Sequence, residues 1–504
     1  MKYVLKAHEM KAYDRDTSDR IGIPSMVLME RAALAAVEVI LRKGHVPGKV
    51  LIAAGCGNNG GDGLAIGRLL AFKGSEVVFF MAGNQAKMSV ETKAQAAILK
   101  NSGFSIQSNF EMKEYDMVID ALFGIGLSRN VEGIYYDVIE KINACGRRGA
   151  VILSVDIPSG ICADTGSILG SAVRADLTVS FAFAKRGHLL YPGREYTGEL
   201  IVKDIGITRQ SFGKEPPAAF CYERSDVAEL LPKRRPDGNK GTFGKVLLLS
   251  GCQDMGGACI LCGRSILKTG AGMVKIITPS CNREILQNAV PEAMLYTFDE
   301  EPDKEKLEKS IDWADVIVAG PGMGMKKSAY QLLKYILEEA AGPLVLDADA
   351  LNLIAAHENL RMLAAGYGTG RLVITPHPGE LARLTGTLIE EYQKHREELV
   401  YALAKELHCV VAAKDAVTMV AQDGKREVYI NTSGNDAMAG AGSGDVLAGI
   451  IGGLLAQKKE IFDAACLGVY LHGLAGEEAS LKEGRYGMTA SDMLNKLSFV
   501  MREA

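Results

Sequence analysis

Short apolar runs recur along this chain, and most of them end at a glycine or at a polar residue. A helical pattern follows the first of them, over Leu64–Phe72. This alternation predicts an α/β fold whose parallel strands form a sheet, with ligands at the carboxyl ends of the strands. The runs expected to form strands are Val50–Ala54, Val77–Met81, Met117–Asp120, Val151–Asp156, Val246–Ser250, Val274–Thr278, Val316–Ala319, Leu344–Asp347, Leu372–Thr375 and Val410–Ala413.

Two domains are expected, because 504 residues exceed the size of one ordinary hydrophobic core. The segment Thr208–Ser225 interrupts the pattern, and Pro216 and Pro217 stand in its polar stretch, which is typical of a linker. The expected domains are residues 1–215 and 224–504. The two halves share an architecture but no repeated motif.

Composition argues against two classes of protein. The formal net charge of −4 gives no electrostatic basis for a nucleic-acid surface. The opening residues Met1–Asp16 lack the apolar core of a signal peptide, and the most apolar stretch, Val446–Ala456, is far shorter than the roughly 20 residues that span a bilayer. We therefore expect a cytoplasmic protein in a bacterium or archaeon, with an organelle and a trimmed transit peptide as the alternative in a eukaryote.

The ten cysteines are scattered, which is typical of a reducing compartment. Cys259 and Cys262 form a CxxC pair, but no second pair follows at a spacing that suits zinc. We expect both to be buried helical residues rather than metal ligands.

A glycine-rich loop follows the first expected strand. Gly55, Gly57 and Gly60 fit the pattern GxGxxG, which brings backbone amides to a helix N-terminus. The next strand ends in Met-Ala-Gly and lacks the acidic residue of an ordinary NAD fold. Asn58, Asn59 and Asp62 either serve turn geometry alone or supply oxygen ligands and hydrogen bonds; the glycines already provide the geometry, so we favour the second interpretation.

Carboxylates at two further strand ends could converge on this loop. Asp120 precedes a flexible glycine-containing stretch, and Asp156 precedes a turn in which Pro158 and Gly160 flank Ser159. Oxygen ligands from Asn59, Asp120 and Ser159 suit an alkali or alkaline-earth cation better than zinc. Either aspartate could instead cap a helix.

A second glycine-rich turn, Gly442–Asp445, lies directly before the helix expected over Val446–Leu455. Free amides and the helix dipole at such a turn stabilise a phosphoryl group in transfer. Asp445 could accept the proton of an attacking hydroxyl, or it could be only a helix cap. No GxxxxGK[ST] motif occurs, so the chain is not a P-loop enzyme.

The first half resembles the NAD(P)H-hydrate epimerases over roughly Met1 to Thr208. The segments above carry this resemblance, together with Glu9-Met10, Ile23-Pro24-Ser25 and Leu28-Met29-Glu30. The resemblance implies a Rossmann-like three-layer domain that interconverts R and S hydrates, potassium at Asn59, Asp120 and Ser159, and Asp156 as the candidate catalytic base. The residues it implies for hydrate binding are Asn58, Asn59, Gly60, Gly61, Asp62, Gly124, Ile125, Gly126, Leu127, Ser128, Arg129, Asn130 and Asp156.

Ser225–Ala504 resembles the ribokinase-like, ADP- or ATP-dependent NAD(P)H-hydrate dehydratases. The motifs are Gly320-Pro-Gly-Met-Gly, Asp347-Ala-Asp-Ala-Leu-Asn, Thr375-Pro-His-Pro-Gly-Glu and Lys414-Asp-Ala-Val-Thr, although Ser443 stands where threonine is common. The resemblance implies Asp445 as the catalytic residue and Mg²⁺ with the nucleotide. It implies hydrate contacts at Ala258, Gly322, His377 and Asp445, and nucleotide contacts at Lys414, Asp415, Ala416, Val417, Thr418 and Gly444.

Together the two resemblances imply repair of hydrated NADH and NADPH, without nucleic-acid or membrane partners. The alternatives are a ribokinase-like kinase of a small alcohol and a non-catalytic scaffold. The residues do not choose ATP over ADP, although ADP is the expectation for prokaryotic fusions of this kind. Apolar residues near the N-terminus could pair subunits in a homo-oligomer.

Overall fold

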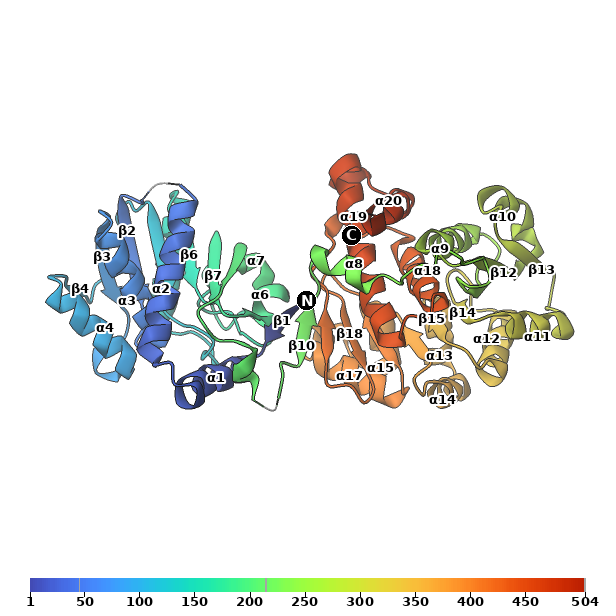
Figure 1. Ribbon diagram of the computed structural model, residues 1–504, viewed down its shortest axis with the longest axis horizontal. Helices are drawn as coiled ribbons and strands as arrows, with labels where there is room; N and C mark the ends of the chain where they lie inside the picture. Colours follow the sequence, from blue (N-terminus) through green and yellow to red (C-terminus); the bar gives the residue numbers. More distant parts are fainter. Residues whose placement is uncertain (45, 214, 503–504) are drawn as a thin grey trace. The chain divides into compact units, whose positions relative to one another are not determined.

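The computed structural model describes residues 1–44, 46–213 and 215–502, and the chain divides into two compact units (Figure 1). One unit is Lys2–Ala219, and the other is Phe220–Ala504 together with Met1. Within the described residues, no helix combines the length and apolar character needed to cross a membrane.

The N-terminal unit is built on a parallel sheet with helices on both faces. Alternate residues of β2 (Lys49–Ala54) enter different cores: Ile52 packs with residues of α2 (Ser25–Arg42) and α3 (Asn58–Ala71), and Leu51 packs with α5 (Ile134–Arg147). This makes three layers, as expected for a Rossmann-like domain. The strand order is β4 (Ile106–Gln107), β3 (Glu76–Met81), β2, β5 (Met117–Ala121), β6 (Val151–Val155), β7 (Leu177–Phe181) and β9 (Glu199–Lys203).

The C-terminal unit has a longer sheet. Its strands are parallel as far as β17, and β18 and β19 add an antiparallel end. Helix α9 (Gly256–Thr269) packs on α18 (Ser443–Ala456) so closely that a Cβ at Gly449 would lie 1.8 Å from Ser265 Oγ. The strand order is β13 (Met294–Phe298), β12 (Met273–Pro279), β11 (Lys245–Leu249), β14 (Val316–Ala319), β15 (Leu344–Leu346), β16 (Leu372–Ile374), β17 (Val410–Ala413), β18 (Met419–Gln422) and β19 (Val428–Ile430).

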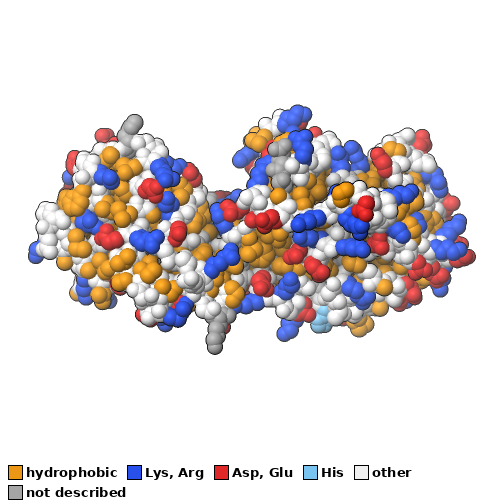
Figure 2. Space-filling view, viewed as in Figure 1, with side chains coloured by type: hydrophobic (Ala, Val, Ile, Leu, Met, Phe, Trp, Pro, Cys, Tyr) orange, Lys and Arg blue, Asp and Glu red, His pale blue; other side chains and the backbone are white. Residues whose placement is uncertain are grey.

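All ten expected strands are confirmed, with each end within one residue of the prediction. Four strands end one residue earlier than expected, each before a polar residue whose amide still donates to the neighbouring strand. These residues are Asp156, Ser250, Asp347 and Thr375. Cys259 and Cys262 are buried on α9, as expected, and all ten cysteines are free. Figure 2 shows acidic and basic side chains interspersed on the visible face, in line with the nearly balanced charge.

The segment expected to be a linker is partly folded onto the N-terminal unit. The short helix η3 (Arg209–Phe212) buries Ser211 and Phe212. The Phe212 ring lies 4.8 Å from that of Tyr13 and 5.3 Å from that of Tyr3, measured between centroids. Prolines and polar residues indicated a break in the pattern, but they could not reveal this aromatic packing, which depends on residues about 200 positions away.

Candidate active sites

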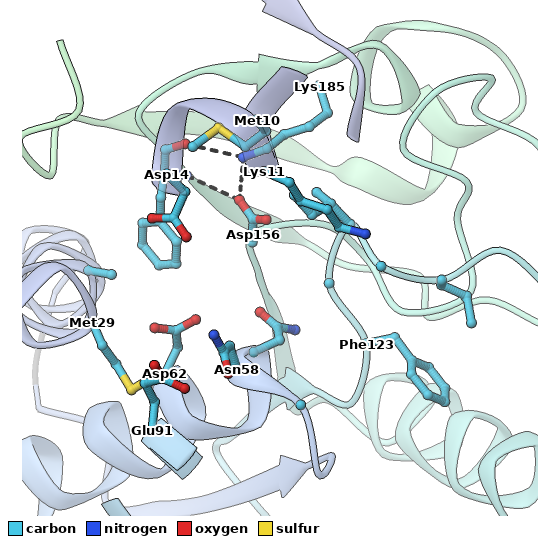
Figure 3. A pocket seen from close by; sticks show the side chains of 18 of the residues that line it. Met10, Lys11, Asp14, Met29, Asn58, Asp62, Glu91, Phe123, Asp156 and Lys185 are labelled. Carbon is cyan, nitrogen blue, oxygen red and sulfur yellow. Dashed lines mark hydrogen bonds and ion pairs between the residues drawn. The ribbon is translucent and has the colours of Figure 1, made fainter. Parts of the chain in front are cut away.

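A cavity of about 580 Å³ opens in the N-terminal unit at the carboxyl end of its sheet (Figure 3). Its walls come from α1 (Ala7–Asp16), α2, the start of α3 and the segments that follow β5 and β6. A cavity of this size can hold a small organic ligand. The polar and charged residues that line it are Lys11, Asp14, Ser25, Asn58, Asn59, Asp62, Glu91, Ser128, Arg129, Tyr135, Asp156 and Lys185.

Most residues expected to hold a hydrate line this cavity. They are Asn58, Asn59, Asp62, Gly124, Ile125, Gly126, Leu127, Ser128, Arg129 and Asp156. Gly60 and Gly61 do not line it, because they are buried in the first turn of α3, where a Cβ at Gly60 would lie 1.9 Å from the carbonyl oxygen of Gly55. Asn130 is exposed and lies outside the lining.

Asp156 is held rigidly just beyond the end of β6. Its φ of 66° is left-handed, a conformation that aspartate and asparagine adopt more readily than most residues. The ammonium of Lys185 donates to Asp156 Oδ1, and His188 Nε2 lies 2.8 Å from the Asp156 carbonyl oxygen. Lys185 is only 1% exposed, and burial together with the Lys185 charge lowers the pKa of His188 to about 3. A neutral His188 therefore donates from Nε2 and fixes the backbone of Asp156.

Three further carboxyl groups face the same cavity, and sequence reasoning assigned no acid–base role to them. Burial and the nearby Glu91 and Asp156 raise the pKa of Asp14. Burial and the carboxyl groups of Asp156 and Asp14 raise the pKa of Asp62 well above its usual range. Glu91, on α4 (Val90–Asn101), accepts a hydrogen bond of 2.9 Å from Ser25 Oγ. Nothing local in the sequence marks Asp14 or Glu91 as site residues, since both lie in ordinary amphipathic helices.

Two of the three expected cation ligands, Asp120 and Ser159, are in direct contact beside this cavity, and the third, Asn59, lines it. Asp120 is buried at the end of β5, and its carboxylate accepts hydrogen bonds from Ser159 Oγ at 2.6 Å and from Ser154 Oγ at 2.8 Å. Burial raises the pKa of Asp120, and these hydrogen bonds oppose the rise. Asn59 is 8% exposed, and its side-chain amide has no hydrogen-bond partner among the described residues. A cation bound to Asn59 Oδ1 would give this oxygen, one of the two unpartnered atoms of the amide, an interaction partner.

The second site lies at the carboxyl edge of the C-terminal sheet, where α18 begins. Gly442 is the N-cap residue of this helix, with a φ of 87°, and as a glycine it makes no side-chain capping hydrogen bond. Asp445 is therefore not the N-cap residue, which rules out the alternative that it serves only as a helix cap. Burial and the nearby Asp347 raise the pKa of Asp445 to about 7, and Lys414 opposes the rise. A carboxyl group with such a pKa is suited to general base catalysis near neutral pH.

Lys414 connects the two sides of this second site. Its ammonium donates to Asp347 Oδ1 at 2.6 Å, and Asp347 is 1% exposed. A Cβ at Gly444 would lie 3.1 Å from Lys414 Nζ, so Gly444 and Lys414 are neighbours. A Cβ at Gly322 would similarly lie 3.0 Å from the Ala258 Cβ. Two pairs of the predicted site residues are therefore adjacent in space.

The rest of the predicted nucleotide segment is more varied. Asp415 pairs with Arg396 at 2.5 Å, and Ala416 is exposed. Val417 is completely buried and Thr418 nearly so, so the side chain of Val417 belongs to the core. Any ligand contact of Val417 would have to be made by its backbone.

His377 has a structural role in this region. It precedes α15 (Pro378–Thr385), and its Nδ1 accepts hydrogen bonds from the amides of Gly379 at 3.0 Å and Glu380 at 3.4 Å. Its side chain is half exposed, with Nε2 3.3 Å from Glu380 Oε1. Burial raises the pKa of Glu380 to about 7, and burial lowers that of His377. The capping role occupies Nδ1, and Nε2 is the ring nitrogen of His377 that could contact a ligand, since Glu380 is buried and accepts from the His377 amide.

Sequence reasoning also missed His472. Its Nε2 lies 2.9 Å from the carbonyl oxygen of Ser443 and 3.2 Å from Ser443 Oγ, at the start of α18. Burial lowers the pKa of His472 to about 4. This neutral histidine steadies the turn from the helix α19 (Ile461–Gly487), far along the chain, so no local motif could have indicated it.

The molecule is thus a two-unit α/β enzyme with a Rossmann-like domain and a ribokinase-like domain. Residues 25–187 match the family model described as YjeF-related protein N-terminus, and residues 246–498 match the model described as NAD(P)H-hydrate dehydratase. A crystal structure of a ribokinase-like superfamily protein from Enterococcus faecalis is 30% identical with a TM-score of 0.51, covering 56% of this chain and 96% of that chain.

Two curated relatives match both units at once. The bifunctional NAD(P)H-hydrate repair enzyme of Moorella thermoacetica is 38% identical, over 99% of this chain and 97% of its own length. The enzyme of the same name from Escherichia coli is 34% identical, over 98% of this chain and 93% of its own length. The chain therefore belongs to the family of bifunctional NAD(P)H-hydrate repair enzymes. This confirms the family that the motifs indicated, and it tells against the small-alcohol kinase and the scaffold.

The ion pair of Lys185 and Asp156 yields a first prediction. Lys185→Met removes the ammonium and leaves a largely buried carboxylate without its partner, so we expect the N-terminal unit to lose about 3 kcal/mol of stability. Hydrogen exchange of β6 and β7 amides in the full chain measures this loss. The double variant Lys185→Met with Asp156→Asn should recover part of it, and equal losses in the single and double variants would contradict the assignment.

Proposed function

We propose that the N-terminal unit interconverts the R and S hydrates of NADH and NADPH, and that the C-terminal unit dehydrates the S form with ADP or ATP. The observation that carries this assignment is the pair of separate sites. One is a cavity around Asp156, and the other is the start of α18 with Asp445 beside Lys414. Each domain thus has its own acid–base group, so the two steps can proceed independently.

In the epimerase site, Asp156 would move a proton at the C6 hydroxyl of the hydrate. C6 carries both this hydroxyl and the ring nitrogen, and the nitrogen lone pair can open the centre when a carboxyl group assists. The Lys185 and His188 contacts hold Asp156 in place for this transfer. The amides and side chains of Asn58 and of Gly124–Arg129 would bind the rest of the dinucleotide.

We propose that Asn59, Asp120 and Ser159 hold potassium. The orphaned Asn59 amide and the buried Asp120 carboxylate support an oxygen site, and a large alkali ion tolerates such irregular ligands. When bound, the ion supplies a fixed positive charge beside the ligand. Asp120 and Ser159 themselves position the backbone beyond β5, since Phe123 N donates to Ser159 Oγ at 2.9 Å.

In the dehydratase site, Asp445 would take the proton of the C6 hydroxyl while the oxygen of that hydroxyl attacks the terminal phosphorus of the nucleotide. The shortened nucleotide leaves, and the hydrate then carries a phosphate at C6. The ring nitrogen expels this phosphate, and loss of a proton from C5 restores the double bond of NAD(P)H. The amides at the start of α18 and the ammonium of Lys414 would stabilise the phosphoryl group.

Mg²⁺ would arrive with the nucleotide. Among the described residues, no group of three histidine, cysteine, aspartate or glutamate side chains is arranged to hold a metal ion. Mg²⁺ usually keeps several waters and binds through phosphates and one or two carboxylates, and Asp347 and Asp349 are the carboxyl groups whose charges act on Asp445. We propose ADP as the preferred nucleotide, because the family resemblance implies it.

We also propose that the enzyme works in a reducing compartment and forms a homo-oligomer. The free cysteines fit a reducing compartment such as the cytoplasm. Val27 and Leu34 on α2 are 47% and 55% exposed and one heptad apart, and they are the apolar residues through which subunits could pair.

One assay tests both activities. Purified protein receives a mixture of R and S hydrates with ADP or with ATP, and the absorbance of restored NADH is followed. Complete conversion is expected, because the epimerase continually supplies the S form. Conversion of only the S fraction would remove the epimerase assignment, and no recovery with either nucleotide would remove the dehydratase assignment.

The pKa of Asp445 predicts how dehydration depends on pH. A general base acts in its deprotonated form, so kcat/KM for dehydration should rise about tenfold per pH unit below pH 7 and level off above it. Asp445→Asn should abolish dehydration while the same chain still epimerises, which controls for folding. A rate that is constant between about pH 5.5 and 8 would contradict the role of Asp445 as base.

Removal of potassium should slow epimerisation, and its return should restore the rate. Asn59→Ala removes the orphaned Oδ1, so we expect this variant to need at least about tenfold more potassium for half-maximal rate. Epimerisation is followed by separating the two hydrates chromatographically. Asn101→Ala, an exposed change at the end of α4, is the matched control, and an unchanged potassium requirement in Asn59→Ala would refute the ligand role.

A further inference from the structure

Two carboxyl groups face the cavity of the N-terminal unit from different walls. Asp62 lies on α3, and Asp156 lies beyond the end of β6. Figure 3 shows them on opposite sides of the opening, with Asp14 and Lys185 on the side of Asp156. A ring placed between them would present one face to each carboxyl group.

Asp62 stands without a partner in the part of the chain that the structure describes. Among the described residues, its carboxyl group makes no hydrogen bond or ion pair, whereas Asp156 is paired with Lys185 and Glu91 with Ser25. The amide of Asn59, one turn earlier on α3, is buried, lines the same cavity and is also unpartnered. Asp62 is half-buried and lines the cavity, so its unpartnered carboxyl group is available to a ligand there.

The charges orient that ligand. The carboxyl groups of Asp14, Asp62, Glu91 and Asp156 offer a pyrophosphate no positive charge beyond the Lys185 ammonium that Asp156 already pairs, while Arg129 and Lys11 also line the cavity, with Lys11 Nζ next to Gly126. The phosphates of a dinucleotide therefore belong beside these cations and the Gly124–Arg129 segment. The uncharged hydrated ring belongs among the carboxyl groups.

Inversion at C6 imposes a geometric requirement. The hydroxyl must leave from one face of the ring, and water must add to the other face. A rigidly held carboxyl group such as Asp156 can serve only the face toward it, because catalytic proton transfer needs hydrogen-bond contact or one bridging water. A single base therefore accounts for one half of the reaction.

We propose that Asp62 and Asp156 are an acid–base pair that acts on opposite faces of the hydrated ring, an inference that rests on the proposed epimerase function. In one direction Asp62 gives its proton to the C6 hydroxyl, the C6–O bond breaks, and water leaves as the nitrogen lone pair forms a C6=N1 double bond. Water then adds to C6 from the other face, the double-bond electrons return to nitrogen, and Asp156 takes the proton of the added water. One water leaves and one enters.

The resting protonation states fit this sequence. The raised pKa of Asp62 favours its protonated form, the form that donates, and the ammonium of Lys185 pairs with the carboxylate form of Asp156. The opposite epimer uses the same groups with the roles exchanged. Proton exchange with solvent resets the pair between turnovers.

The test uses the full chain and single hydrate epimers in water labelled with oxygen-18. Asp62→Asn and Asp156→Asn keep the side-chain shape and remove one acid–base group each. We expect epimerisation to fall by roughly 100-fold or more in both variants. In Asp62→Asn, the label should still enter the C6 hydroxyl of one epimer without inversion. In Asp156→Asn, it should enter the C6 hydroxyl of the other epimer, because each remaining carboxyl group serves one face.

Asp137→Asn, an exposed carboxyl-to-amide change on α5, is the control for the substitution itself, and thermal unfolding of each variant controls for folding. Asp62→Asn that epimerises within a few fold of wild type would overturn the proposal. So would loss of all exchange in a folded Asp62→Asn, or exchange into the same epimer in both variants. Failure of the wild-type chain to epimerise would instead overturn the proposed function.

Discussion

The convergence of parallel strands at one edge of each sheet governs both sites. Asp156 and Asp347 each stand one residue beyond a strand, at the edge of the sheet where ligands bind in folds of this kind. Each is then paired with a buried or half-buried lysine, Lys185 in one unit and Lys414 in the other. The same backbone constraint thus produces an aspartate–lysine pair in two unrelated sequence contexts.

The two pairs serve opposite electrostatic purposes. In the N-terminal cavity, Lys185 offsets only part of an excess of carboxyl groups, which suits an uncharged ring and proton transfer. In the C-terminal site, the ammonium of Lys414 and the N-terminal end of α18 lie beside Gly444, where phosphate would bind. The pKa of Asp445, about 7, shows that this carboxyl group is nevertheless buried enough to exchange a proton near neutral pH.

The sequence predicted the features that depend on short segments of the chain. Apolar runs located the strands, and glycine-rich turns located Asp445 and Asn59, because backbone geometry at those turns depends on neighbouring residues. The sequence did not predict the site roles of Lys185, Asp14 and His472, since each reaches its site from an element whose local pattern is ordinary. The burial of Phe212 was not predicted either, because it depends on tertiary contacts. The capping of α15 by His377 is local, but it was not recognised in the sequence.

The left-handed backbone at Asp156 bears on how substitutions in this enzyme should be interpreted. Most side chains pay a steric penalty at a φ of 66°, whereas asparagine tolerates it nearly as well as aspartate. Alanine at this position would therefore combine two defects, a missing proton carrier and a main chain under torsional stress. Only the isosteric amide isolates chemistry from conformation, so a survey made with alanine alone would exaggerate the catalytic share of this residue.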